Sequence, residues 1–122
     1  MPRENVERFY AQVARALAVL YKDHPREARL NVLDVAGSDA DAYEDAKGTI
    51  KWLLDNRFIS GKLGNNVVAG AQLTPRSWKI VAARNMNIRD GVPLGEAAIE
   101  AVDSDNQDDL QRIGELMIGD LI

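Results

Sequence analysis

Apolar residues recur at three- and four-residue steps in two long segments of the chain, and this spacing places them on one face of a helix. The first segment, residues 4–22, carries Val6, Phe9, Tyr10, Val13, Leu17 and Leu20. It predicts a long helix with one buried stripe, ending before Pro25 because a proline disfavours helical angles in the residue before it. The second segment, residues 38–56, predicts another helix, with Ser38 as its N-cap.

The pattern changes between and after these helices. Residues 29–36 fit either a short strand or a two-turn helix, and we favour a strand contact at Leu30 followed by a short helix at 32–36. Residues 58–63 and 67–73 read as two strands, because Gly64, Asn65 and Asn66 between them tolerate the backbone angles of a tight hairpin. Thr74 and Pro75 then form a strong start signal for a helix running to about residue 85 and burying Trp78.

The remaining segment predicts two more helices, an alanine-rich one at 93–102 and an amphipathic one at 107–121. Four apolar side chains lie on one side of the last helix: Leu110, Ile113, Met117 and Leu121. We therefore expect a mostly helical α+β fold, with a core at residues 1–89 and an acidic helical extension at 90–122. The apolar stripe predicts that this extension packs on the core or across the two-fold axis of a homodimer.

Charge divides the 122-residue chain unevenly. The net charge is −4, but residues 1–89 carry 14 Lys and Arg against 10 Asp and Glu, whereas residues 90–122 carry Arg112 against nine acids. A mildly basic body is thus joined to an acidic tail, and a nucleic-acid surface needs only one basic face. The tail could also lie over the basic body and weaken non-specific DNA binding.

Several classes of function lack their residues. The chain has no cysteine and its only histidine, His24, precedes a proline with no second metal ligand nearby. Asp103 begins an acidic run that lacks the glycine and glutamate of a calcium loop. No nucleophile or acid–base pair is recognisable, so we expect neither an enzyme nor a cofactor. Apolar runs are too short for a membrane span, and the expected location is the cytoplasm.

Two segments of the sequence resemble a known family. Residues 49–59, TIKWLLDNRFI, resemble the recognition helix of a winged helix-turn-helix domain running into its first wing strand. Residues 72–75, QLTP, resemble its second wing strand meeting the closing helix. Within that fold the chain resembles a group of uncharacterised bacterial proteins, through VERFY at 6–10 and PLGE at 93–96. It departs from the common pattern at Arg57 and Ser77, where many winged helices carry glycine.

The resemblance implies double-stranded DNA as a partner, with the helix at 38–56 in the major groove and the hairpin near the phosphates. Six residues would then supply mostly phosphate contacts: Lys47, Lys51, Arg57, Lys62, Asn65 and Asn66. The resemblance thus implies a small DNA-binding protein, with transcriptional regulation as the role expected of it. The alternative is a winged-helix module for protein–protein interaction, because acids such as Asp39, Asp41 and Glu44 crowd the start of the same helix.

Trp52 does not fit the core face of its helix, because it lies about 180° from Tyr43 when residues are counted at 100° each. A tryptophan there is either an exposed anchor for a partner or is covered by something outside the minimal fold. We favour cover by the tail helices or by a second subunit. Trp52 therefore joins Leu110, Ile113, Met117 and Leu121 as a candidate interaction or dimer surface.

Overall fold

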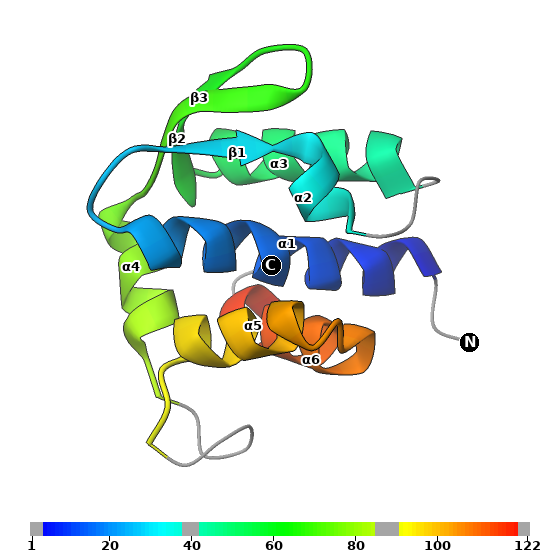
Figure 1. Cartoon of the computed structure of the whole chain (residues 1–122), viewed down its shortest axis with the longest axis vertical. Coiled ribbons are helices and arrows are strands. Elements are labelled where there is room, and N and C mark those ends of the chain that lie inside the picture. The colour runs from blue at the N-terminus through cyan, green and yellow to red at the C-terminus, as the bar shows by residue number, and fades with distance from the viewer. Residues whose placement is uncertain (1–3, 38–41, 85–90, 120–122) are drawn as a thin grey trace.

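The computed structural model of the protein describes residues 4–37, 42–84 and 91–119. These residues form a mostly helical α+β fold with one three-stranded sheet (Figure 1). The elements follow one another as α1 (Glu4–Asp23), β1 (Ala28–Asn31), α2 (Val32–Ala36), α3 (Tyr43–Asp55), β2 (Ile59–Leu63), β3 (Val67–Leu73), α4 (Pro75–Ala82), α5 (Leu94–Asp103) and α6 (Gln107–Ile118). The helices and strands expected from the sequence are all present, with ends that differ by a few residues.

Helix α1 is the centre of the fold. It runs between a layer made of the sheet, α2 and α3 and a second layer made of α5 and α6, and α4 connects the two layers at one end (Figure 1). Residues 11–18 are buried without interruption, including the polar Gln12 and Arg15. The prediction that only one stripe of α1 is buried was therefore wrong. Helices α5 and α6 cover a second face of α1, which carries small alanine side chains.

The strands pair antiparallel in the order β1-β3-β2. Leu30 of β1 lies opposite Val68 of β3, and both side chains are fully buried, which confirms the expected strand contact at Leu30. On the other side of β3, Lys62 lies opposite Ala69. Because side chains alternate along a strand, the sheet buries one face against the helices and exposes the other.

The helix starts follow local chemistry where the sequence supplies it. Thr74 caps α4 as predicted: its hydroxyl accepts from the Ser77 backbone N–H at 3.3 Å, and the Ser77 hydroxyl lies 3.0 Å from the Thr74 N–H. This reciprocal pair is a capping box, and it explains why Ser77 replaces glycine there. Helix α3 begins only at Tyr43, and the predicted cap Ser38 lies outside the described residues.

Trp78 is not buried as the sequence predicted. It is 39% exposed, and its ring stacks on His24 at 4.2 Å and on Tyr21 at 6.0 Å between centroids. Helix α4 ends at Ala82, about a turn earlier than expected, so it presents one short apolar face, centred on the buried Val81. Trp78 lies beside that face and covers the end of α1 instead of entering the core.

Two glycines allow the layer made of α5 and α6 to approach α1 closely. An ideal Cβ on Gly114 of α6 would lie 1.9 Å from the Tyr10 carbonyl oxygen, and one on Gly95 of α5 would lie 2.5 Å from the Tyr21 ring. Burial, followed by the negative charge of Glu96, raises the pKa of the Tyr21 hydroxyl. The two helices of the tail are thus fitted to α1 at the level of the backbone, and they share one hydrophobic core with the rest of the chain.

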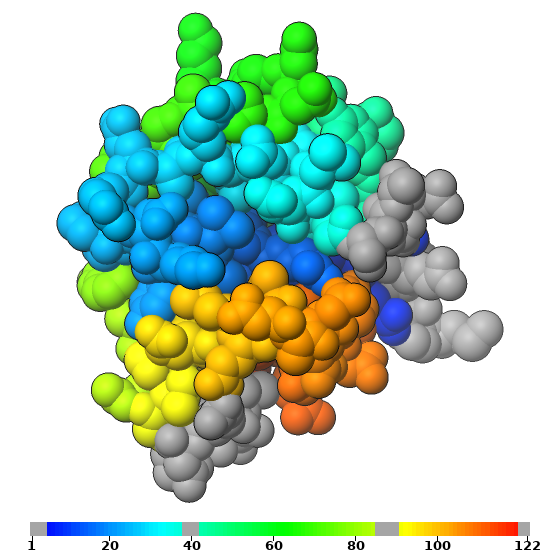
Figure 2. Space-filling model, viewed as in Figure 1, coloured from blue at the N-terminus to red at the C-terminus, as the bar shows by residue number. Residues whose placement is uncertain are grey.

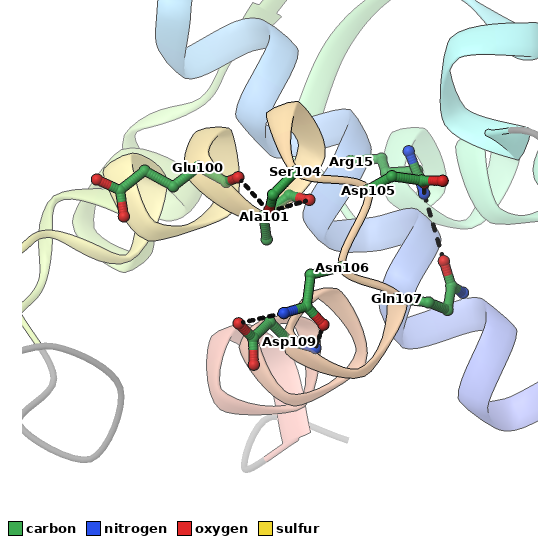
Figure 3. A network of polar contacts seen from close by, with 8 residues as sticks. All are labelled: Arg15, Glu100, Ala101, Ser104, Asp105, Asn106, Gln107 and Asp109. Atoms are coloured by element: carbon green, nitrogen blue, oxygen red, sulfur yellow. Dashed lines mark hydrogen bonds and ion pairs between the residues drawn. The ribbon is translucent and has the colours of Figure 1, made fainter.

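A polar network fastens the turn between α5 and α6 to α1. The buried Arg15 donates from Nη2 to Asp105 Oδ1 at 3.2 Å and to Gln107 Oε1 at 3.3 Å (Figure 3). Asn106 caps α6 by accepting the Asp109 backbone N–H at 3.2 Å. Asp103, Asp105 and Asp109 therefore belong to helix ends and a turn, and no group of three potential metal-binding side chains occurs among the described residues.

Candidate nucleic-acid interface

The six residues predicted to contact phosphates lie on α3, at its C-terminal end and on the β2–β3 hairpin. Lys51 and Lys62 are exposed, and Lys47 is half-buried with its Nζ 5.9 Å from the centre of the Tyr43 ring. Asn65 and Asn66 form the exposed turn of the hairpin. The Tyr43 hydroxyl donates to Asn66 Oδ1, so the start of α3 and the hairpin turn are in direct contact.

Arg57 joins α3 to β2 in a conformation that glycine normally adopts. Its φ is +62°, in the left-handed region, which explains why glycine is common at this place in the proteins that the sequence resembles. Its carbonyl oxygen accepts the Thr74 hydroxyl at 2.7 Å, and its side chain is exposed. The backbone of Arg57 thus has a structural task that leaves the guanidinium free to reach a ligand.

Arg76 was not among the predicted contacts, and the structure places it beside them. Its Nη1 donates to the Asn56 carbonyl at 2.9 Å, and its guanidinium lies 4.3 Å from the centre of the Phe58 ring. This exposed cation comes from α4, so its nearness to Arg57 depends on the hairpin bringing α4 back to the end of α3. Sequence spacing alone carries no signal of that return.

The acidic residues of α3 differ in their surroundings. Asp45 forms an ion pair with Arg8 of α1 at 2.5 Å, and that pair turns its charge toward α1. Glu44 and Asp55 are exposed and form no side-chain ion pair with another described residue, while Asp39 and Asp41 lie outside the described residues. The exposed face of α3 therefore mixes two cations, Lys47 and Lys51, with two carboxylates.

Charge is distributed unevenly across the fold. The layer of the sheet, α2 and α3 carries six Lys and Arg and five Asp and Glu, and α4 with the two residues after it adds Arg76, Lys79 and Arg84. Residues 91–119 carry seven acids and Arg112. Helices α5 and α6 pack on the side of α1 opposite α3 and the sheet (Figure 1). Among the described residues the acidic tail thus packs on α1 of the basic body, on the side away from α3 and the hairpin. In Figure 2 the hairpin side chains project away from α5 and α6.

Trp52 is covered by its own half of the molecule. Its ring lies 5.1 Å from Phe9 in an edge-on contact and stacks on Phe58 at 5.4 Å. The N-terminal half of α1 reaches α3 and supplies Phe9, so part of the cover comes from α1 and not from the tail as predicted, while cover by a second subunit stays a prediction. Pattern analysis of α3 alone could not include that contact.

The apolar stripe of the last helix faces inward. Leu110, Ile113 and Met117 are at most 3% exposed, and α6 packs along α1. These three side chains belong to the core of the single chain and are not presented to a second copy. Leu121, the fourth member of the predicted surface, lies outside the described residues.

Comparison with protein-family models, with curated proteins and with solved structures gives no match for this chain. In the part of the chain that the structure describes, no helix combines the length and apolar character needed to cross a bilayer. We therefore infer function from the geometry and charge of the surface formed by α3, the hairpin and Arg76.

Proposed function

We propose that the protein is a small winged-helix DNA-binding protein that presents α3 and the β2–β3 hairpin to a DNA duplex. The order α1, β1, α2, α3, hairpin, α4 resembles the winged-helix arrangement, and the Tyr43–Asn66 contact sets the hairpin beside α3 as a wing. The observation that carries the proposal is the uneven charge: residues 26–37 and 42–84 have an excess of Lys and Arg, three of them on α4 or just after it, and the acids of α5 and α6 lie on the side of α1 away from α3.

The physical basis is attraction to phosphates. Lys51, Lys62, Arg57 and Arg76 extend from α3, β2, the α3–β2 junction and α4 into solvent. Cations of this kind bind duplex DNA by displacing condensed counterions, which gives an affinity that falls with salt. The opposite charges of the two layers would also orient the molecule as it approaches a polyanion, so that the basic side meets DNA first.

A double substitution tests this surface. We expect Lys51→Ala with Lys62→Ala to weaken binding to every duplex sequence and to reduce the slope of log K against log salt by about 2, because each lost phosphate contact removes about 0.9. Fluorescence anisotropy with a labelled random duplex, titrated at several salt concentrations, measures both quantities. Both side chains are exposed, so the fold should be unchanged by circular dichroism.

Arg112→Ala provides the matched control. Arg112 is an exposed cation on α6, in the acidic layer, and its removal changes the net charge by one unit without touching the proposed surface. It should leave the salt slope close to that of the unchanged protein. A loss of slope in Arg112→Ala of about half that in the double variant, which is the loss expected per removed charge, would show that net charge alone governs binding and would contradict the proposed surface.

A protein–protein interaction module is the second candidate, and the exposed Glu44 and Asp55 on α3 are the observation that favours it. Carboxylates repel phosphates but suit a basic protein surface. Absence of DNA binding by the folded protein at low salt would favour this candidate. A homodimer stays a separate prediction, which sedimentation equilibrium tests. Its interface would use side chains other than the buried Leu110, Ile113 and Met117.

A further inference from the structure

The outward face of α3 is narrow and chemically simple. Besides the exposed Asp45, which pairs with Arg8, five exposed or half-exposed positions of α3 fall within an arc of about 100° when residues are counted at 100° each. They are Glu44, Lys47, Gly48, Lys51 and Asp55. The opposite face is fixed in the core by Ala46, Ile50 and Leu53, so α3 cannot rotate to present other side chains.

The remaining polar groups of α3 are already engaged. The buried Thr49 donates to Gln12 Oε1 at 2.7 Å, and Asp45 pairs with Arg8. Asn56, which follows the helix, donates its amide to the Trp52 carbonyl at 2.9 Å. No Asn or Gln occurs between Tyr43 and Asp55. The face therefore lacks the amide that reads adenine, and the buried Thr49 and Ala46 keep their methyl groups from thymine.

The groups that are left match the other base pair. Lysine donates to guanine O6 and N7 in the major groove, and a carboxylate accepts from the cytosine amino group. Glu44 and Lys47 are three residues apart, so they are neighbours in the first turns of α3, the part of a recognition helix that approaches base edges. The two side chains thus offer one acceptor for cytosine and one donor for guanine at the same place.

Gly48 is a second, independent observation. An ideal Cβ there would meet no atom within 4 Å, so packing inside the described residues does not require the glycine. Glycine inside a helix is unfavourable relative to alanine, but it leaves the helix surface bare, so another molecule can approach the backbone closely there. It lies beside Glu44 and Lys51 on the outward face, where it would let α3 sit deep in a groove.

We propose that α3 reads G·C base pairs in the major groove, with Glu44 accepting from cytosine and Lys47 donating to guanine. This inference rests on the proposed DNA-binding function and adds the class of sequence that the protein prefers. The Glu44 carboxylate would repel a phosphate, but at a base edge it accepts the cytosine amino hydrogen. Lys47 and Lys51 offset its charge there. Lys62, Arg57 and Arg76 supply the sequence-independent phosphate contacts.

A competition experiment with the full chain tests the preference. Unlabelled duplexes of equal length, one built only from G·C pairs and one only from A·T pairs, displace a labelled random duplex at fixed salt. Their phosphate charge is equal, so a difference reports the bases and not counterion release. We expect the G·C duplex to compete at about tenfold lower concentration, as one good side-chain–base pair supplies. Replacing guanine by 7-deazaguanine, which lacks the N7 acceptor, should reduce that advantage.

The Glu44→Gln variant tests whether Glu44 is responsible for the preference for G·C pairs. The amide can pair with adenine but no longer offers a carboxylate to cytosine, so the ratio between the two competitors should shrink while the salt slope is kept. Glu115→Gln, the same change at an exposed site on α6, should keep the full ratio. Both variants must show the circular dichroism of the unchanged protein.

The outcomes separate the two proposals. Equal competition by both duplexes, or a preference for A·T, would overturn the G·C reading and leave DNA binding intact. An unchanged ratio in Glu44→Gln would overturn the role of Glu44. Absence of binding to any duplex at low salt would overturn the proposed function, and this inference with it.

Discussion

Gly114→Ala is expected to destabilise the protein by about 3 kcal/mol, which is the upper end of the usual range for overpacking a core. The added Cβ would lie 1.9 Å from the Tyr10 carbonyl oxygen and 2.6 Å from its carbonyl carbon. Both are backbone atoms of α1, the most buried helix, so they cannot turn aside as a flexible side chain would. Helix α6 has to move away from α1, and the core contacts of Leu110, Ile113 and Met117 weaken together.

Urea denaturation followed by circular dichroism measures this loss, and Gly48→Ala is its matched control. The same substitution at an exposed helical site, where a Cβ meets nothing within 4 Å, should stabilise the protein by about 0.5–1 kcal/mol. A Gly114→Ala variant as stable as the unchanged protein would show that α6 does not cross α1 at this distance. Such a result would also remove the evidence that α5 and α6, the acidic helices, pack against α1.

Phe58→Ala is expected to destabilise the protein by about 3–5 kcal/mol, the range for truncating a fully buried aromatic side chain. Phe58 is 1% exposed and stacks on Trp52, and the Arg76 guanidinium covers its other side at 4.3 Å. Its ring therefore joins α3, the start of the hairpin and α4. Removing the ring leaves a cavity at this junction, which fixes the orientation of the hairpin relative to α3.

Phe9→Ala is the comparison for that variant. Phe9 touches the same tryptophan at 5.1 Å, but it is only half-buried, so its truncation should cost less than that of Phe58 in the same urea experiment. A smaller loss in Phe58→Ala than in Phe9→Ala would contradict the packing at the α3–hairpin junction. Where enough folded Phe58→Ala protein remains, it should also bind DNA more weakly, because the hairpin loses its support.

The sequence predicts well those elements that carry their own local signals. Thr74 with Pro75 marks the start of α4, and Gly64 with two asparagines marks the hairpin turn, because both depend on residues within a few positions. The strand contact at Leu30 was correctly favoured over a longer helix. The coarse α+β class follows from these elements, whereas the winged-helix interpretation stays a proposal.

Long-range contacts explain what the sequence analysis missed. The prediction of one stripe on α1 failed because alanines do not mark a buried face, although α5 and α6 cover them. Trp52 and Trp78 were misplaced because their partners, Phe9 and His24, come from other segments of the chain. The charged residues divide in the same way. The sequence analysis placed Lys51 and Lys62 on the surface, but it did not predict the ion pair between Asp45 and Arg8 or the position of Arg76 beside Asn56.

The position of the acidic helices changes how the candidate surface works. Because α5 and α6 bury one side of α1, they are part of the core, and a chain cut before them would expose residues such as Ala18, which lies beside Ile99 and Val102 of α5. Binding must therefore be measured on the full chain. Under the proposed function, the acids held away from α3 would orient the molecule toward a polyanion, an effect that weakens as salt is added.

The most direct test of the central claim is fluorescence anisotropy of a labelled random duplex titrated with the full, folded chain from low to moderate salt. The account predicts saturable binding at low salt that weakens steadily as salt rises, with a log–log slope that reports several phosphate contacts. Absence of binding at low salt by protein with intact circular dichroism would contradict it. The surface formed by α3, the hairpin and Arg76 would then have to be assigned to a protein partner.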